Sequence, residues 1–138
     1  MISTVLTRFI KSKDMKAYTD LEQSKKLAEI LPDESADAFY DMAEPEKRQV
    51  PIIGDPDDYY DMEDWTTPCW SLAALLEIIP FPHLSWYKYE DSPLKWNCVS
   101  IPMLNGKDIS PVVEVRDLPN AIDACVEMIL KLKERNLL

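Results

Sequence analysis

The sequence contains only two glycines, Gly54 and Gly106, in 138 residues. Phosphate-binding loops of the dinucleotide and P-loop types need several glycines close together, so this scarcity excludes both kinds of loop. His83 is the only histidine, and no closely spaced pair of cysteines accompanies it. A catalytic zinc site is therefore not expected, because it takes several ligands of these types. We predict no cofactor, no metal ligand and no catalytic residue.

Basic residues are outnumbered, with 15 lysines and arginines against 25 aspartates and glutamates and a formal net charge of −10. Contacts to phosphates dominate nucleic-acid affinity, so a chain this acidic is not expected to bind DNA or RNA directly. An unidentified protein partner with a basic surface suits this charge better.

The sequence also lacks a long apolar run. The longest one, LAALLEIIPF, is short and is interrupted by Glu77, which is typical of a core helix and not of a membrane span. The first residues, MISTVLTRFIKSK, have neither a long apolar stretch nor a small-residue cleavage site, so no signal peptide is expected. These absences favour a cytoplasmic protein without membrane contact.

Three cysteines are present, Cys69, Cys98 and Cys125, and they lie far apart in the sequence. Each has apolar neighbours, so we expect buried, reduced side chains of a cytosolic protein and no disulfide framework. A nucleophilic pair of Cys69 or Cys98 with His83 would need a proximity that nothing in the sequence predicts.

The chain is long enough for one domain, and apolar residues make up 46% of it, enough for a core. We divide this single domain into three stretches. Residues 1–42 form an N-terminal helical segment that is expected to pack on the main domain. Residues 43–66 form an acidic connector marked by prolines, and residues 67–138 form an α+β core.

The connector contains DPDDYYDMEDW, residues 55–65, with six acidic side chains in eleven positions. A calcium loop starting at Asp55 would need glycine where Tyr60 stands and glutamate where Thr66 stands, so this motif is excluded. A solvated connector, with Trp65 anchored on the following domain, is the favoured interpretation. Imitation of nucleic-acid charge stays open. The candidate binding residues are Asp57, Asp58, Tyr59, Tyr60, Asp61 and Trp65.

In the first half, TDLEQSKKLAEIL predicts a helix over residues 19–31, because its leucines and isoleucine gather on one side. Thr19 and Glu22 have the spacing of a capping box, and Pro32 ends the helix. Weaker patterns favour a short helical turn that begins at Asp33, an edge strand within residues 1–10 and an extended piece at VPII.

The second half predicts the succession helix, strand, strand, strand, helix. The first helix would start at Pro68 with Thr67 as its cap, and the last would start at Asp117 or Asn120. Alternating patterns predict the strands HLSWYKY, KWNCVSI and SPVVEVRD. Short connections favour an antiparallel sheet of about three to four strands, covered by helices on one face, which defines an α+β fold.

Aromatic residues are concentrated in the middle of the chain. Alternate aromatics on a half-buried sheet belong to the core, and those that face outward would form a binding surface of residue types common at hot spots. Stacking of single-stranded bases would also need a basic groove, which the few nearby lysines do not provide. The residues concerned are Trp65, Trp70, Trp86, Trp96, Tyr87 and Tyr89.

Four short boxes span the chain: EQSKKL at 22–27, SAD at 35–37, WSLAALL at 70–76 and D-A-x-x-E-M at 123–128. Together they resemble a family of short uncharacterised proteins of gut Bacteroidetes and of their phages, prophages and mobile elements. The resemblance implies an intracellular accessory protein of phage or mobile-element biology. It brings no reaction, cofactor or catalytic residue.

The sequence thus favours a small non-catalytic module that binds another protein. Two alternatives stay open: a divalent-metal-dependent hydrolase or nucleotide-modifying enzyme that uses carboxylates, and an acidic inhibitor that imitates nucleic-acid charge. The sequence leaves the oligomeric state open as well.

Overall fold

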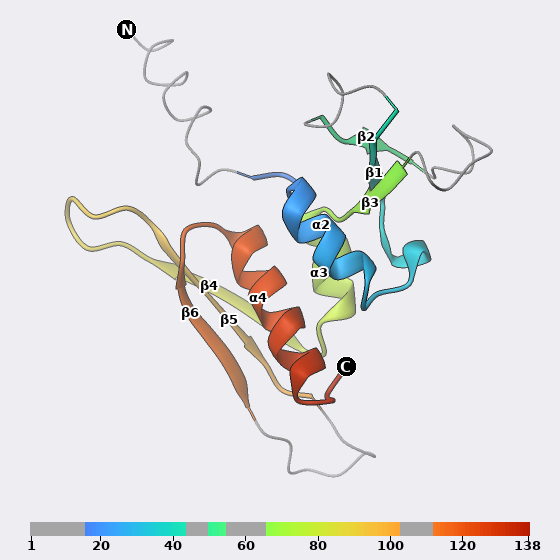
Figure 1. Cartoon of the computed structure of the whole chain (residues 1–138). Helices are drawn as coiled ribbons and strands as arrows, with labels where there is room; N and C mark the ends of the chain where they lie inside the picture. Colours follow the sequence, from blue (N-terminus) through green and yellow to red (C-terminus); the bar gives the residue numbers. More distant parts are fainter. Residues whose placement is uncertain (1–15, 44–49, 55–65, 103–111) are drawn as a thin grey trace, which may run out of the picture.

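A computed structural model describes residues 16–43, 50–54, 66–102 and 112–138, and these residues form helices and two three-stranded antiparallel sheets (Figure 1). The predicted α+β fold class is confirmed. No helix within the described ranges is long and apolar enough to cross a membrane. The elements are α2 (Leu21–Ala28), a 3-10 helix (Asp33–Ser35), β1 (Ala38–Asp41), β2 (Ile52–Ile53), β3 (Thr66–Cys69), α3 (Leu72–Ile78), β4 (Pro82–Tyr87), β5 (Lys95–Ser100), β6 (Val113–Leu118) and α4 (Ala121–Glu134).

The second half is a three-stranded sheet in the order β4-β5-β6, with α3 before it and α4 after it in the chain. Helix α4 packs on β5 and β6, and α3 packs against α4, so the helices cover one face of the sheet (Figure 1). The predicted succession of helix, three strands and helix is confirmed.

Alternation along the strands decides which side chains enter the core. In β5, Cys98 and Ser100 are buried under the helices, whereas the alternate residues Asn97 and Val99 lie on the other face. The register places Leu84 of β4 opposite Cys98, so an apolar row crosses the sheet beneath α4. The main core combines this row with α2, α3 and α4 through Leu27, Leu31, Trp70, Ala74, Leu75, Ile79, Cys98, Val113, Ile122, Ala124, Cys125, Val126, Met128, Ile129 and Leu132.

Helix α4 starts where side-chain chemistry favours a start. The side chain of Asn120 accepts a hydrogen bond from the backbone N–H of Asp123 at 2.8 Å, so Asn120 is the N-cap. Lys131 and Lys133 lie in the last turn, where positive charge is favourable to the helix dipole. Of the two predicted starts, Asn120 is confirmed and Asp117 is wrong.

Asp117 instead lies in a bulge of β6. Trp96 pairs with Leu118 and Cys98 with Val115, so β6 has one more residue than β5 across this interval. Asp117 has a φ of 65°, a left-handed conformation that aspartate tolerates better than most residues. Its backbone N–H donates to the Asn97 side chain at 3.1 Å, which satisfies the displaced donor.

The smaller sheet, in the order β2-β1-β3, is built mainly from the first half. The predicted helical turn at Asp33 is present as the 3-10 helix, and the extended piece at VPII is present as β2. Strand β1 was not predicted. All four of its residues are buried, so the alternation that reveals a half-buried strand is absent from the sequence.

The predicted cap of α2 is wrong by one residue, and the predicted cap of α3 is wrong by four. Helix α2 has Asp20 as its N-cap, with a capping box to Gln23, because the Thr19 side chain is engaged elsewhere. Helix α3 has Ser71 as its N-cap, since Thr67 and Pro68 belong to β3 and pair with β1. A proline is accepted there because β3 is an edge strand.

The two halves are joined by reciprocal hydrogen bonds between Thr19 and Trp70. The Thr19 N–H donates to the Trp70 carbonyl at 2.9 Å, and the Trp70 N–H donates to the Thr19 hydroxyl at 3.1 Å. The fully buried Trp70 indole donates in turn to the Ser35 hydroxyl at 2.9 Å. The first helix therefore packs against the second half of the chain.

The predicted edge strand within residues 1–10 lies outside the described residues, as does most of the connector 43–66.

The buried face of α4 makes a direct prediction about stability. Leu132→Ala should lower the free energy of unfolding by about 2–5 kcal/mol, because a fully buried leucine leaves a cavity. Glu127→Ala, at an exposed position of the same helix, should change it by less than about 0.5 kcal/mol. Urea denaturation monitored by tryptophan fluorescence measures both. Equal losses in the two variants would contradict the orientation of α4.

Candidate functional site

The predicted binding residues Asp57, Asp58, Tyr59, Tyr60, Asp61 and Trp65 all lie outside the described residues. The acidic surface therefore stays a prediction. The other predicted recognition element, the aromatic residues that face outward, is described by the structure.

Three aromatic side chains are exposed near the end of the hairpin formed by β4 and β5, with Trp86 on the helix-covered face of the strand and Tyr87 on the other face. Trp86 is 62% exposed, Tyr87 36% and Tyr89 75%. The hairpin extends beyond the helices that cover the rest of the sheet (Figure 1), so no helix within the described ranges shields its end. We call these three residues the aromatic hairpin surface. By contrast, Trp70 is buried, and Trp96 packs against the main core.

The loop of the hairpin, between β4 and β5, is held by Ser92. The Ser92 hydroxyl donates to the Tyr89 carbonyl at 2.6 Å, and the Ser92 N–H donates to the same carbonyl at 2.7 Å. The Tyr89 N–H donates to the Ser92 hydroxyl at 3.1 Å. Tyr89 and Tyr87 are in edge-to-face contact, with ring centroids 5.7 Å apart. The backbone of this surface is therefore fixed although its side chains are exposed.

Tyr87 is also anchored across the sheet. Its hydroxyl donates to the carboxylate of Asp117 in the β6 bulge, and the Asp117 N–H is held by Asn97 of β5. This hydrogen bond to Asp117 raises the pKa of Tyr87, because loss of the phenolic proton would place a second negative charge beside the carboxylate. All three strands thus contribute to positioning one aromatic ring. No local sequence pattern predicts this contact, because it depends on the bulge.

The three thiols of the chain are buried, which disfavours a nucleophilic role. All three cysteines are buried and free, as predicted. Burial, followed by the nearby charge of Asp37, raises the pKa of Cys69 to about 12. A hydrogen bond with Cys98, followed by burial, raises the pKa of Cys125. His83 pairs with Val99, whereas Cys98 is paired on the helix-covered face, so Cys98 and His83 lie on opposite faces of the sheet.

The part of the chain that the structure describes holds no group of three or more histidine, cysteine, aspartate or glutamate side chains arranged to bind a metal ion.

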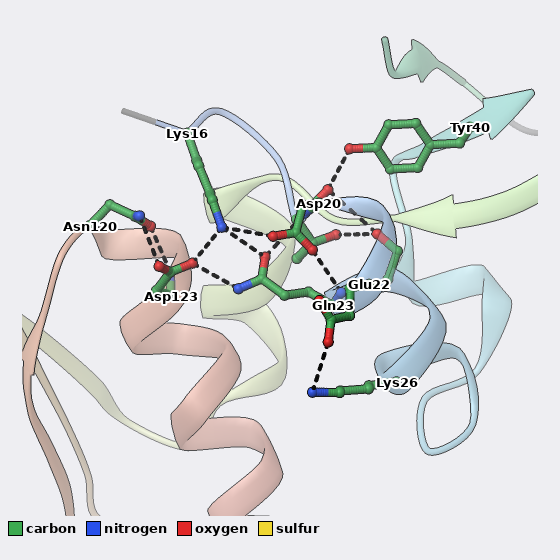
Figure 2. A network of polar contacts seen from close by, with 10 residues as sticks. Lys16, Asp20, Glu22, Gln23, Lys26, Tyr40, Asn120 and Asp123 are labelled. Carbon is green, nitrogen blue, oxygen red and sulfur yellow. Dashed lines mark hydrogen bonds and ion pairs between the residues drawn. The ribbon is translucent and has the colours of Figure 1, made fainter. Parts of the chain in front are cut away.

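A polar cluster joins the first helix to the last one (Figure 2). The Lys16 ammonium group donates to Asp20 at 2.9 Å and to Asp123 at 2.8 Å. The Gln23 amide donates to the same Asp123 oxygen at 2.7 Å, and the Asn120 amide donates to its second oxygen at 3.0 Å. We call Lys16, Asp20, Gln23 and Asp123 the Lys16 clamp. Its polar groups bind one another and the caps of α2 and α4, so it acts as a structural link.

The clamp shifts the titration of two of its members. Burial lowers the pKa of Lys16, but hydrogen bonds and charges from Asp123 and Asp20 outweigh it, and the net pKa is raised. Burial also opposes ionisation of Asp20, yet hydrogen bonds from the Gln23 backbone and from Lys16 bring its pKa below the ordinary value. Both shifts favour the charged forms, which is the signature of a satisfied ion pair. The sequence did not predict the clamp, since Lys16 and Asp123 are far apart along the chain.

A scan against protein-family models, a comparison with curated proteins and a comparison with solved structures all give no match for this chain.

The lowered pKa of Asp20 predicts a stability difference that depends on pH. Asp20→Asn keeps a good N-cap but removes the charge that pairs with Lys16. Because ionisation is favoured in the folded state, its stabilisation is present above pH 3.8 and is lost as the pH falls through the lower folded pKa. The Asp20 side chain is half-exposed, so water screens its ion pair with Lys16. We therefore expect the free energies of unfolding of Asp20→Asn and the wild type to differ by less than about 1 kcal/mol at pH 6.

Urea denaturation between pH 2 and pH 6 measures this difference. Asp91→Asn, at an exposed position of the hairpin loop, is the control and should show no comparable pH dependence. A constant difference between Asp20→Asn and the wild type over the whole range would contradict the assignment.

Burial of the thiols predicts slow chemical labelling. With a pKa of about 12, only roughly one Cys69 in ten thousand is ionised at pH 8, and the side chain is also inaccessible. The folded protein should therefore leave all three thiols unreacted with a disulfide reagent over minutes, and unfolding in urea should release three equivalents. Ala73→Cys, at an exposed position of α3, should add one rapidly reacting thiol. Rapid labelling of a native cysteine would contradict the packing.

Proposed function

We propose that this protein is a non-catalytic module that binds another protein through the aromatic hairpin surface. The observation that carries the proposal is the joint exposure of Trp86, Tyr87 and Tyr89 on a backbone fixed by hydrogen bonds. Tryptophan and tyrosine are enriched among residues that dominate binding energy, and a rigid surface loses little entropy on binding. Exposed aromatics on both faces of one hairpin end suit a partner that encloses that end.

The charge of the chain defines the kind of partner. With a net charge of −10, the protein attracts a basic partner at long range and repels nucleic acid. In this proposal the acidic stretch at residues 57–65 adds electrostatic attraction, and the aromatic hairpin surface supplies the apolar contact. Complementary charge mainly increases the rate of association, whereas buried aromatic contacts decide its lifetime.

The proposal includes a cytoplasmic accessory role in phage or mobile-element biology, which rests on the resemblance of the four sequence boxes. Residues within these boxes have structural roles here: Gln23 and Asp123 meet in the Lys16 clamp, and Trp70 joins the two halves. Such roles suit a resemblance in fold. The charge-imitation alternative depends on an acidic connector that lies mostly outside the described residues, and the hydrolase alternative needs a metal-binding group that the described residues do not hold. Both stay predictions.

The experiment that tests the proposal compares Tyr89→Ser and Trp86→Ser with Phe81→Ser. Phe81 is an exposed aromatic residue at the opposite end of β4, so it matches the loss of exposed aromatic area. Affinity capture from a bacterial host extract should recover the same partner with the wild type and with Phe81→Ser. With the purified partner, calorimetry should then show affinity weakened at least tenfold by Tyr89→Ser or Trp86→Ser.

Two results would overturn the proposal. The first is a wild-type protein that captures no partner, and the second is a partner bound equally well by all four proteins. Circular dichroism of each variant shows that the fold is retained.

A further inference from the structure

Strand β4 is an edge of the larger sheet, and among the described residues only β5 pairs with it. Its pairing with β5 is unbroken over all six residues, from Pro82 opposite Ser100 to Tyr87 opposite Lys95. An edge strand of this kind presents a row of backbone donors and acceptors that another strand can pair with.

The two edges of this sheet are protected to different degrees. Strand β6 carries Glu114, Arg116 and Asp117, and its bulge interrupts regular pairing. Charges and bulges of this kind are how proteins block pairing with a foreign strand. Strand β4, PHLSWY, has neither a bulge nor a charged residue, although 29% of the chain is charged. Its single proline is the first residue, where it leaves the rest of the strand free to pair.

We infer that β4 pairs antiparallel with β4 of a second copy of this chain, about a two-fold axis, to form one continuous six-stranded sheet. The inference rests on the proposed function in one respect, because Trp86 belongs to the aromatic hairpin surface. In this arrangement the edge of β4 binds a second copy of the chain. Tyr89 lies beyond the paired strands and stays available to the protein partner of the proposed function.

The side chains of β4 select the register of this pairing. Residues directly opposite each other in an antiparallel pair have side chains on the same face of the sheet. The two-fold axis must therefore lie at a residue of β4 and not midway between two consecutive residues. With the axis at Ser85, Trp86 lies opposite Leu84 of the second copy, and His83 lies opposite Tyr87 of the second copy. This register uses His83 through Tyr87 in both copies.

The contact at Trp86 favours a second copy as the occupant. Trp86 is 62% exposed, whereas Leu84 packs against the main core, so pairing brings each exposed indole onto the rim of the other core. Aromatic and aliphatic side chains opposite each other stabilise a strand pair. Since β4 has no charge, the pairing puts no like charges opposite each other in a protein of net charge −10. The contact is isologous, as closed dimers require.

The test measures the molar mass of the purified protein by light scattering and by sedimentation over a range of concentrations. One strand per copy is a small interface, so the mass should rise from 15.9 kDa towards twice that value in the micromolar range. Ser85→Lys and Ser85→Glu should each keep the mass of a single chain, because like charges meet at the axis. An equimolar mixture of these two variants should form the dimer again. Ser85→Thr, a good strand residue, is the matched control and should dimerise like the wild type.

A wild-type protein that stays monomeric at all concentrations would overturn the inference. This result is expected if the edge of β4 pairs with a strand of another protein instead. A dimer that persists in Ser85→Lys, or a mixture that fails to dimerise, would overturn the register. The rescue by mixing shows that the variants are folded. The mass measurements need no partner protein. The comparison of partner affinity between Tyr89→Ser and the wild type needs no dimer. The two proposals can therefore fail independently.

Discussion

The arrangement of the described elements depends on the junction between Thr19 and Trp70. Thr19 immediately precedes the cap of α2, and Trp70 immediately follows β3 and precedes the cap of α3. Their reciprocal backbone and hydroxyl hydrogen bonds therefore set the starts of two helices at once. The Tyr40 hydroxyl donates to the Thr19 carbonyl at 2.6 Å, which ties β1 to the same point. Because these groups are buried, each unmade hydrogen bond would cost about 1–3 kcal/mol, and the junction forms as a unit.

The second half of the fold follows from the sequence because its elements are half-buried. One face of each strand meets the helices and the other does not. In β5, buried side chains therefore alternate with less buried ones, as in Cys98 and Ser100 against Asn97 and Val99. The last helix has an apolar face long enough to be recognised, and Asn120 supplies its cap. The outward aromatics were predicted as a set. Which of them are exposed depends on how far the hairpin extends past the helices, and that is a tertiary property.

The first half is less predictable because its elements are short and depend on distant contacts. Strand β1 is buried on both faces and shows no period, and β3 contains Pro68, which the local pattern assigns to a helix start. The cap of α2 moves from Thr19 to Asp20 because Thr19 binds Trp70, a contact over 51 positions. The Lys16 clamp brings together residues 107 positions apart, and no local pattern records it. Tertiary contacts override local preference at each of these places.

The separation between Lys16 and Asp123 has a consequence for synthesis on the ribosome. The segment that leads into α2 is made first, but its ammonium group finds its second carboxylate only when α4 has emerged. Closing so long a loop is slow, and a growing chain folds in the order in which its contacts become available. Helix α2 can therefore pack on β3 and Trp70 before α4 is made, but Lys16 and Gln23 can bind Asp123 only afterwards. The link between α2 and α4 is thus among the last contacts that these described elements can form.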